Sequence, residues 1–288
     1  MHKAKNARMS VCAIVALTGL TTAANAELVY GLTDNNDLVT WDSGDSTNIL
    51  SGVSVWGMQQ NETLRGIDFR PATGQLYAVG SYNNLYTVDV NTGQASQVGS
   101  GPFAPVANGS SFGFDFNPVI DRIRYVSDAN QNLVLNPNDG TSTLVTSLFF
   151  GAGDINEGVD PSVVGSAYTN SFMGATSTQL YGIDSELDIL VTQANSAGTL
   201  MTVGSLGVDI NDTLSFDISG GSGLAFATMQ LNDMSRSTFW MIDLSTGNAT
   251  MLGEIGGGGV ITSMAVTPAP ASLALIGLGG AMMGRRRR

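Results

Sequence analysis

The feature that most constrains the fold of this chain is an internal repeat through its middle. Three segments share one pattern of alternating apolar residues around a central aspartate: Leu64–Pro71 (LRGIDFRP), Ser111–Pro118 (SFGFDFNP) and Thr213–Ser219 (TLSFDIS). Two weaker copies are Val164–Asn170 and Ile261–Thr267. Alignment of the five central positions, Asp68, Asp115, Ala167, Asp217 and Ala265, gives steps of 47, 52, 50 and 48 residues. Such a period indicates a repeat architecture.

Each repeat continues with further short alternating stretches. In the first, Gln75–Val79 is followed by Asn84–Asp89, a turn at Asn91–Gly93 and a last stretch that ends at Val98-Gly99. Alternation bounded by Gly, Asn and Asp is typical of half-buried strands joined by tight turns. We predict that the third strand recurs at the following segments: Leu133–Asn136, Leu180–Asp184 and Phe239–Asp243.

Four strands per repeat predict an all-β fold, a β-propeller of about five blades. The last copy holds only one strand, so we expect strands near the N-terminus to complete that blade and close the ring. The candidate strands are Leu28–Leu32, Asp37–Asp42 and Asn48–Val55. A six-bladed ring and an irregular β-sandwich remain as alternatives.

Several segments resemble the DUF4394 domain family. They are Ser111–Ser127 with its Asp121-Arg-Ile-Arg124 stretch, Gln131–Leu133, Asn136-Pro137, Ala167–Asn170, Leu180–Asp184 and Gly204–Gly207. The resemblance extends over most of residues 28–267. It implies a β fold built of repeats, and the family carries no established catalytic residues that could be assigned to this chain.

The N-terminal residues are typical of a secretory signal peptide. Basic residues at Lys3, Lys5 and Arg8 precede an apolar stretch, and Ala24-Asn25-Ala26 follows. A basic region, a short apolar region and an Ala-x-Ala site are the parts that signal peptidase recognises. We therefore expect cleavage between Ala26 and Glu27, with a retained membrane anchor as the alternative.

The C-terminal residues 268–288 resemble the PEP-CTERM sorting signal of Gram-negative bacteria. Pro268 and Pro270 precede an uncharged apolar segment, and four arginines follow: Arg285, Arg286, Arg287 and Arg288. Such arginines stay on the cytoplasmic side of a membrane. The resemblance implies transient anchoring in the inner membrane, processing by an exosortase, and delivery to the cell surface or extracellular matrix. Ala269 stands where the signature has glutamate, so a plain membrane anchor with an arginine stop is the alternative.

The domain between these ends, residues 27–267, is strongly acidic. It holds all 24 acidic residues against five arginines, a net charge of −19, and it has no lysine, histidine or cysteine. This charge disfavours binding to nucleic acid, because phosphates are repelled. The composition excludes disulfides, cysteine nucleophiles, Ser-His-Asp triads and histidine-ligated metals. The acidic surface either attracts cations such as Ca²⁺ or serves only to keep the domain soluble.

Three groups of residues are candidates for a site. Asp68, Asp115 and Asp217 occupy one position on the first strand of three blades, which lines the channel of a propeller, so they are candidate catalytic carboxylates of a glycosidase. The alternative is that each accepts hydrogen bonds within the repeat. Arg122 and Arg124 alternate on one strand and are candidates for binding an anionic sugar or for pairing with Asp121 or Asp115.

The third group is a candidate calcium site. Asp154, Asn156 and Asp160 place oxygen ligands at alternating positions around a glycine, although the loop lacks the bidentate glutamate of an EF-hand. A simple surface connection is the alternative, and no other cofactor is predicted. Trp41, Trp56 and Tyr82 are candidates for stacking on sugar rings.

We predict an exported surface or matrix protein that contacts polysaccharide or protein without catalysis. A carboxylate-based glycosidase in the propeller channel is the alternative function.

Overall fold

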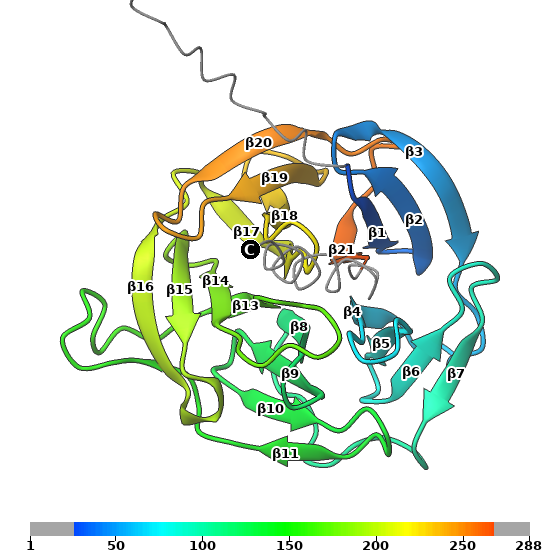
Figure 1. Cartoon of the computed structure of the whole chain (residues 1–288), viewed down its shortest axis with the longest axis horizontal. Coiled ribbons are helices and arrows are strands. Elements are labelled where there is room, and N and C mark those ends of the chain that lie inside the picture. The colour runs from blue at the N-terminus through cyan, green and yellow to red at the C-terminus, as the bar shows by residue number, and fades with distance from the viewer. Residues whose placement is uncertain (1–25, 268–288) are drawn as a thin grey trace, which may run out of the picture.

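The structure is a computed structural model that describes residues 26–267, and these residues form five sheets, each with four antiparallel strands, around a central axis (Figure 1). Residues 1–25 of the predicted signal peptide (1–26) lie outside the described residues, as does the predicted sorting tail with Pro268, Pro270 and the four arginines. The only helix in the described part is a 3-10 turn, η1, at Asn195–Ala197. The prediction of an all-β, five-bladed propeller is confirmed, and the six-bladed and sandwich alternatives are wrong.

Four blades are built from consecutive strands, with the first strand of each nearest the axis. They are β4–β7 (Leu64–Phe69, Leu76–Gly80, Leu85–Val88, Ala95–Val98); β8–β11 (Phe112–Asn117, Arg122–Ser127, Asn132–Leu135, Ser142–Leu144); β13–β16 (Val163–Tyr168, Leu180–Asp184, Ile189–Gln193, Thr199–Ser205); and β17–β20 (Ile210–Ile218, Ala225–Leu231, Thr238–Ile242, Ala249–Glu254). The short strand β12 (Phe149–Phe150) adds to the outer edge of the third of these by pairing in parallel with β16.

The fifth blade is made from both ends of the described chain, as predicted. Its strands are β21 (Ile261–Val266), β1 (Leu28–Thr33), β2 (Asp37–Asp42) and β3 (Asp45–Ser54), in that order from the axis outward. Val29 lies opposite Val266, and the Thr267 amide donates to the Leu28 carbonyl at 3.1 Å. This pairing covers the inner edge of β1 and closes the ring.

One strand assignment within a blade was wrong. Leu180–Asp184 is the second strand of its blade, and the third is β15, which begins at Ile189. The side chain of Asp184 accepts hydrogen bonds from the amides of Glu186 and Leu187 and so forms the turn between the two strands. Both β14 and the third strand of the first repeat read as Leu-Tyr-x-apolar, so sequence similarity alone could not separate them.

The hydrophobic core lies between neighbouring blades rather than at one centre. One apolar cluster, for example, joins Tyr77 and Leu85 of one blade to Phe116 and Ile123 of the next. The Tyr77 and Phe116 rings meet edge to face with centroids 5.2 Å apart. Burial of this apolar surface on both faces of each blade holds the ring together.

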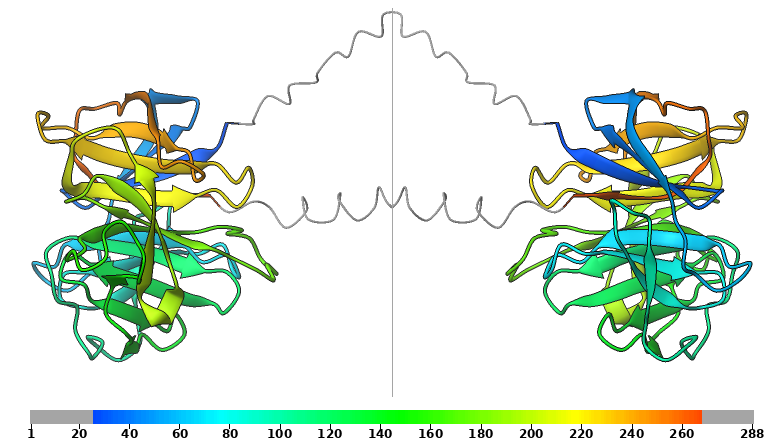
Figure 2. Two further views of the ribbon diagram at one scale, coloured as in Figure 1. Left: turned by 90° about the vertical axis from the view of Figure 1, so that its left-hand side faces the viewer. Right: turned by 90° about the vertical axis from the view of Figure 1, so that its right-hand side faces the viewer.

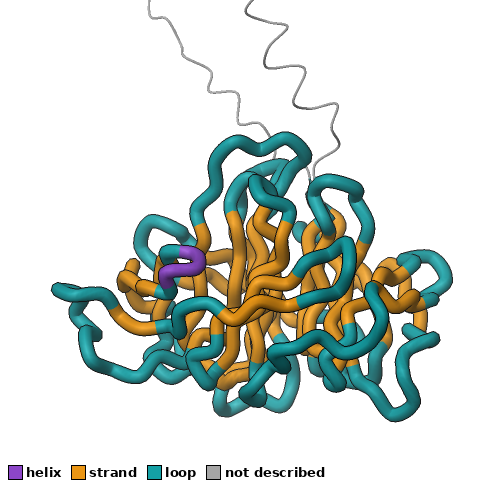
Figure 3. Tube along the Cα trace, turned by 90° about the horizontal axis from the view of Figure 1, so that it is seen from below, coloured by secondary structure: helices purple, strands orange, loops and turns teal. Residues whose placement is uncertain are grey.

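The described residues form a flat disc with turns on two faces (Figures 2 and 3). Both ends of the described chain lie on the same face (Figure 3). Within residues 26–267 there is no helix of the length and hydropathy needed to cross a membrane.

Candidate functional site

The inner strands bring the three predicted carboxylates together at the axis. Asp68 lies on β4, Asp115 on β8 and Asp217 on β17, and one oxygen of each lies within 4.8 Å of the others. Each of the three side chains is at most 3% exposed. The repeat register therefore predicted the convergence correctly, because equivalent positions of a propeller face the same axis.

Each carboxylate joins its own blade to the next inner strand. Asp68 Oδ2 accepts the Phe116 amide at 2.7 Å, Asp115 Oδ1 accepts the Tyr168 amide at 3.1 Å, and Asp217 Oδ2 accepts the Val266 amide at 2.6 Å. These donors lie one residue after the aligned position of the following blade. The buried amide of each of these three strands is thereby satisfied by a side chain.

In two repeats an alanine stands at the aligned position, and this accounts for the second hydrogen bond of Asp68 and of Asp217. Ala265 and Ala167 cannot accept the amides of Phe69 and Ile218, so Asp68 Oδ1 and Asp217 Oδ1 accept them within their own strands, at 2.7 and 2.6 Å. Five of the six carboxylate oxygens thus accept a backbone N–H. Asp115 Oδ2 is the one without a hydrogen bond in the described part of the chain.

Burial and crowding favour the protonated carboxyls. Burial and then the charge of Asp217 raise the pKa of Asp68 well above its usual range. Burial and then the charges of Asp68 and Asp217 do the same to the pKa of Asp115. Burial raises the pKa of Asp217 to about 6, although hydrogen bonds from Val266 and Ile218 oppose the rise.

The geometry of the three axial carboxylates suits hydrogen bonding between neighbouring blades better than glycoside hydrolysis. A glycosidase needs two carboxyl groups about 5 Å or more apart on either side of a bound sugar. Here the carboxylates are buried, and their oxygens are used by backbone donors. Three oxygens at this spacing are compatible in distance with a cation, but Ca²⁺ needs about six to eight oxygen ligands, and five of these six oxygens already accept N–H groups.

The two candidate arginines lie on β9 and differ in exposure. Arg124 is 2% exposed and donates to Asn132 Oδ1 at 2.6 Å, and its guanidinium also contacts the Tyr168 hydroxyl of the next blade. Arg122 is half-buried and donates to the Asp121 carbonyl. The carboxylate of Asp121 pairs instead with Arg70. The structure thus places Arg124 between two blades, away from any ligand in solvent.

The candidate calcium ligands take part in different contacts. Asp154 accepts the Thr202 amide and hydroxyl at 2.6 and 2.8 Å, and Asn156 donates to the same hydroxyl at 3.0 Å. Asp160 accepts from the side chain of Asn130 at 2.5 Å. Asp154 thus fixes its loop to β16, and Asp160 fixes the loop to the neighbouring blade.

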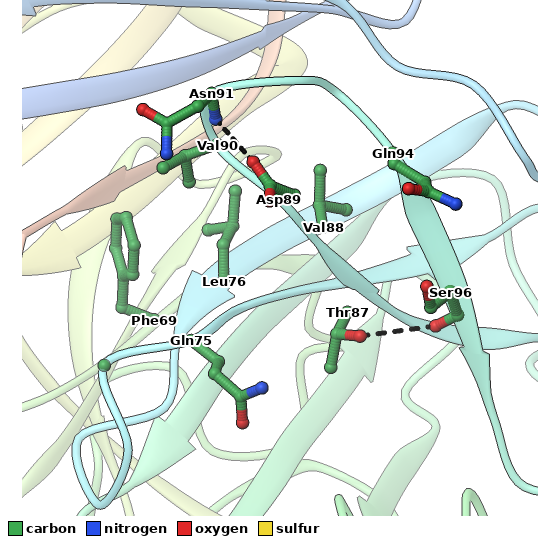
Figure 4. Close-up of a pocket in the computed structure, with 11 residues that line it drawn as sticks. Phe69, Gln75, Leu76, Thr87, Val88, Asp89, Val90, Asn91, Gln94 and Ser96 are labelled. Atoms are coloured by element: carbon green, nitrogen blue, oxygen red, sulfur yellow. Dashed lines mark hydrogen bonds between the residues drawn. The ribbon is translucent and has the colours of Figure 1, made fainter.

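A hollow of about 400 Å³ lies on the blade of β4–β7, at the face where β4 ends (Figure 4). Its floor is apolar and buried, from Phe69, Leu76 and Val88, and its exposed rim includes the carboxamides of Gln75, Asn91 and Gln94. Those three carboxamides make no hydrogen bond with another described side chain or backbone group. The Asp89 carboxylate shapes the rim by accepting the amides of Asn91 and Thr92 at 2.9 and 3.0 Å.

The sequence indicates a turn beside this hollow but not the hollow itself. The sequence predicts a turn at Asn91–Gly93, and nothing in the pattern marks its side chains for binding. The same Asp-x-x-Thr-Gly corner stands at Asp89–Gly93 in this blade and at Asp243–Gly247 in the β17–β20 blade. Among the candidate aromatic residues, Trp41 is completely buried, whereas Trp56 and Tyr82 are about half exposed.

Comparisons with known proteins give a family match and a structural neighbour. The family described as "Domain of unknown function (DUF4394)" matches residues 37–265. No curated protein matches the chain. A chain of the crystal structure of a nidogen/laminin complex is similar in shape, with a TM-score of 0.49 and 9% identity over 84% of this chain and 98% of that one.

Proposed function

This chain belongs to the DUF4394 family, whose description gives no activity, and we propose that it is a non-enzymatic propeller that binds saccharide. The hollow on the β4–β7 blade carries the proposal. Its apolar floor suits the non-polar face of a sugar ring, and its three carboxamides offer both donors and acceptors to hydroxyl groups. A volume of about 400 Å³ lies in the range of small-molecule sites.

The axial carboxylates support a binding function rather than a catalytic one. They are buried, and five of their six oxygens hold backbone amides, so their removal would loosen the ring. We therefore place this saccharide on the disc surface, in the hollow of the β4–β7 blade, and not at the axial carboxylates.

We further propose that the protein reaches the cell surface or extracellular matrix through its signal peptide and its PEP-CTERM-like tail. Signal peptidase and an exosortase would then be its processing partners. Glu27 supports cleavage after Ala26, because its amide donates to Ser43 Oγ at 2.9 Å and its carboxylate accepts from Ser219 and Ser222, so Glu27 is held by the described domain. Intact-mass analysis of the protein released by its host tests both cleavages.

The binding test uses the extracellular polysaccharide of the producing organism. Retention of the protein by immobilised polysaccharide should fall at least tenfold in the double variant Asn91→Ala/Gln94→Ala. The matched control is Ser245→Ala/Asn248→Ala, which changes the equivalent corner on the β17–β20 blade and should bind as the unchanged protein does. Equal retention of both variants would show that the hollow is not the saccharide-binding site. Release of reducing ends that disappears in Asp115→Asn would instead make the protein an enzyme.

A further inference from the structure

A second hollow lies at the opposite end of β4, at the mouth of the central channel. Its volume is about 220 Å³, and its lining residues lie at or near the starts of four inner strands, β4, β8, β17 and β21. These strands lie around the axis in Figure 1. The polar residues that line it are Arg65, Ser110, Ser111, Asp212, Thr213 and Thr262. It is smaller than the usual range for drug-sized ligands, about 300–1,000 Å³, so its size suits a single small molecule.

Arg65 gives this hollow its only positive charge. Its guanidinium carbon lies 4.9 Å from the centre of the Phe112 ring, and that ring stacks on Tyr125 with centroids 4.9 Å apart. A cation is attracted to an aromatic face, and the Arg65 N–H groups make no hydrogen bond within the described residues, so they can donate to a planar acceptor. The guanidinium also lies near the Tyr125 hydroxyl, where its charge opposes the rise that burial causes in the pKa of Tyr125. Among residues 26–267 the ion pairs are Arg70–Asp121 and Arg236–Glu254, so Arg65 has no carboxylate within pairing distance.

Four hydroxyl groups line the same hollow as this arginine. The hydroxyls of Ser110, Ser111 and Thr213 make no hydrogen bond within the described chain, whereas Thr262 donates to the Leu32 carbonyl. Asp212 also lines the hollow, but its carboxylate accepts from the Ser185 hydroxyl at 2.5 Å. The site thus combines one arginine that has no ion pair with several hydroxyl groups that can donate or accept hydrogen bonds.

From this arrangement we propose that the channel mouth binds a small hydroxylated carboxylate, of the class of a uronic acid. The guanidinium edge donates two parallel hydrogen bonds to the carboxylate, and the serine and threonine hydroxyls bond the ligand's hydroxyl groups. A single carboxylate is selected over a polyanion, because the domain around the site carries a net charge of −19. This site shares no lining residue with the saccharide hollow, so an experiment can overturn one proposal without affecting the other.

The test is a saturation-transfer-difference NMR titration of the full chain with glucuronate, glucose and acetate. We expect saturable glucuronate binding and at least tenfold weaker binding of glucose and acetate. Arg65→Gln should weaken glucuronate binding at least tenfold, whereas the control Arg236→Gln, which removes an exposed arginine, should not change it.

Arg65→Lys keeps the charge without the planar fork and should give an intermediate loss, which guards against a folding defect in the first variant. Absence of saturable glucuronate binding, or equal binding by the Arg65→Gln variant, would overturn the proposal. Equal affinity for acetate and glucuronate would overturn the assignment to a hydroxylated ligand.

Discussion

At the scale of single residues, the three axial aspartates differ in how many of their oxygens are used. Asp217 accepts a backbone amide with each oxygen, whereas Asp115 accepts one amide and keeps Oδ2 without a partner in the described chain. Asparagine has one acceptor oxygen and one donor group. Substitution of aspartate by asparagine should therefore change the stability of the fold in opposite directions at Asp115 and Asp217.

We expect Asp115→Asn to raise the free energy of unfolding at neutral pH by on the order of 1 kcal/mol, the equivalent of one unit of pKa shift. The amide keeps the bond to Tyr168, carries no charge and can donate to a neighbouring carboxylate. Asp217→Asn should lower the free energy of unfolding by about 1–3 kcal/mol, because it leaves one buried amide unpaired. Urea denaturation of both variants checks this, and a loss of stability in both would contradict it.

The pH dependence of stability follows from the direction of these pKa shifts. When the pKa of a carboxyl is higher in the folded than in the unfolded state, the folded state binds more protons at any pH between the two values. The free energy of unfolding therefore falls as pH rises through this range. For Asp217 that fall extends from about pH 4 to about pH 6. Asp68 and Asp115 act in the same direction.

Exposed turn aspartates oppose this trend only at lower pH. Hydrogen bonds from nearby turn residues lower the pKa of Asp89, Asp139 and Asp243. These three aspartates therefore stabilise the folded state above the usual aspartate pKa, and this stabilisation is lost as pH falls below it. We expect the melting temperature to be highest near about pH 4 to 5 and to fall toward pH 7. A melting temperature that rises from pH 5 to pH 7 would show that the axial carboxyls do not control it.

At the scale of strands, the ring depends on β21. This strand pairs with β1, its Val266 amide bonds Asp217, and its Ser263 hydroxyl accepts the Ile67 amide of β4 at 2.9 Å. A chain from Glu27 that ends at Gly259 should therefore fail to fold cooperatively, because it exposes the edges of both β1 and β4. A chain that ends at Thr267 is the control and should melt in one transition by circular dichroism. Cooperative melting of the shorter chain would contradict the closure argument.

The loop between β12 and β13 gives a second test at this scale. Asp154→Ala removes three acceptor contacts to the loop and to β16, so limited proteolysis should cut the loop several times faster while the rest of the ring stays intact. We expect the cutting rate of the unchanged protein to be the same in calcium and in chelator, because Asp154 is already bonded to Thr202. Protection by calcium that is lost in Asp154→Ala would instead support the predicted calcium site.

The blades could be predicted because each inner strand repeats one pattern in one register. The convergence of Asp68, Asp115 and Asp217 follows from that register alone. The hollow around Arg65 could not be predicted, because its residues come from four strands whose side chains meet only once the ring is closed. Nor does the sequence reveal that Arg124 is buried, since an alternating strand pattern does not say which neighbour covers its face.

At the scale of the whole molecule, charge is the dominant feature. The domain carries 24 acidic groups and five arginines, and only two ion pairs involve arginines within residues 26–267. Like charges on a compact body repel one another, and salt weakens this repulsion because the Debye length falls from about 30 Å at 0.01 M to about 3 Å at 1 M. Since the unfolded chain spreads its charges further apart, salt should stabilise the folded ring.

We therefore expect the melting temperature to rise by several degrees between about 0.01 M and 0.5 M sodium chloride at pH 7. The rise should be much smaller at pH 4, where many surface carboxylates are protonated. The buried axial carboxyls are screened far less than the surface charges, so the fall in stability between pH 4 and pH 6 should persist at high salt. If high salt abolishes that fall, surface repulsion is its cause. If the fall persists and Asp115→Asn reduces it, the axial cluster is the cause.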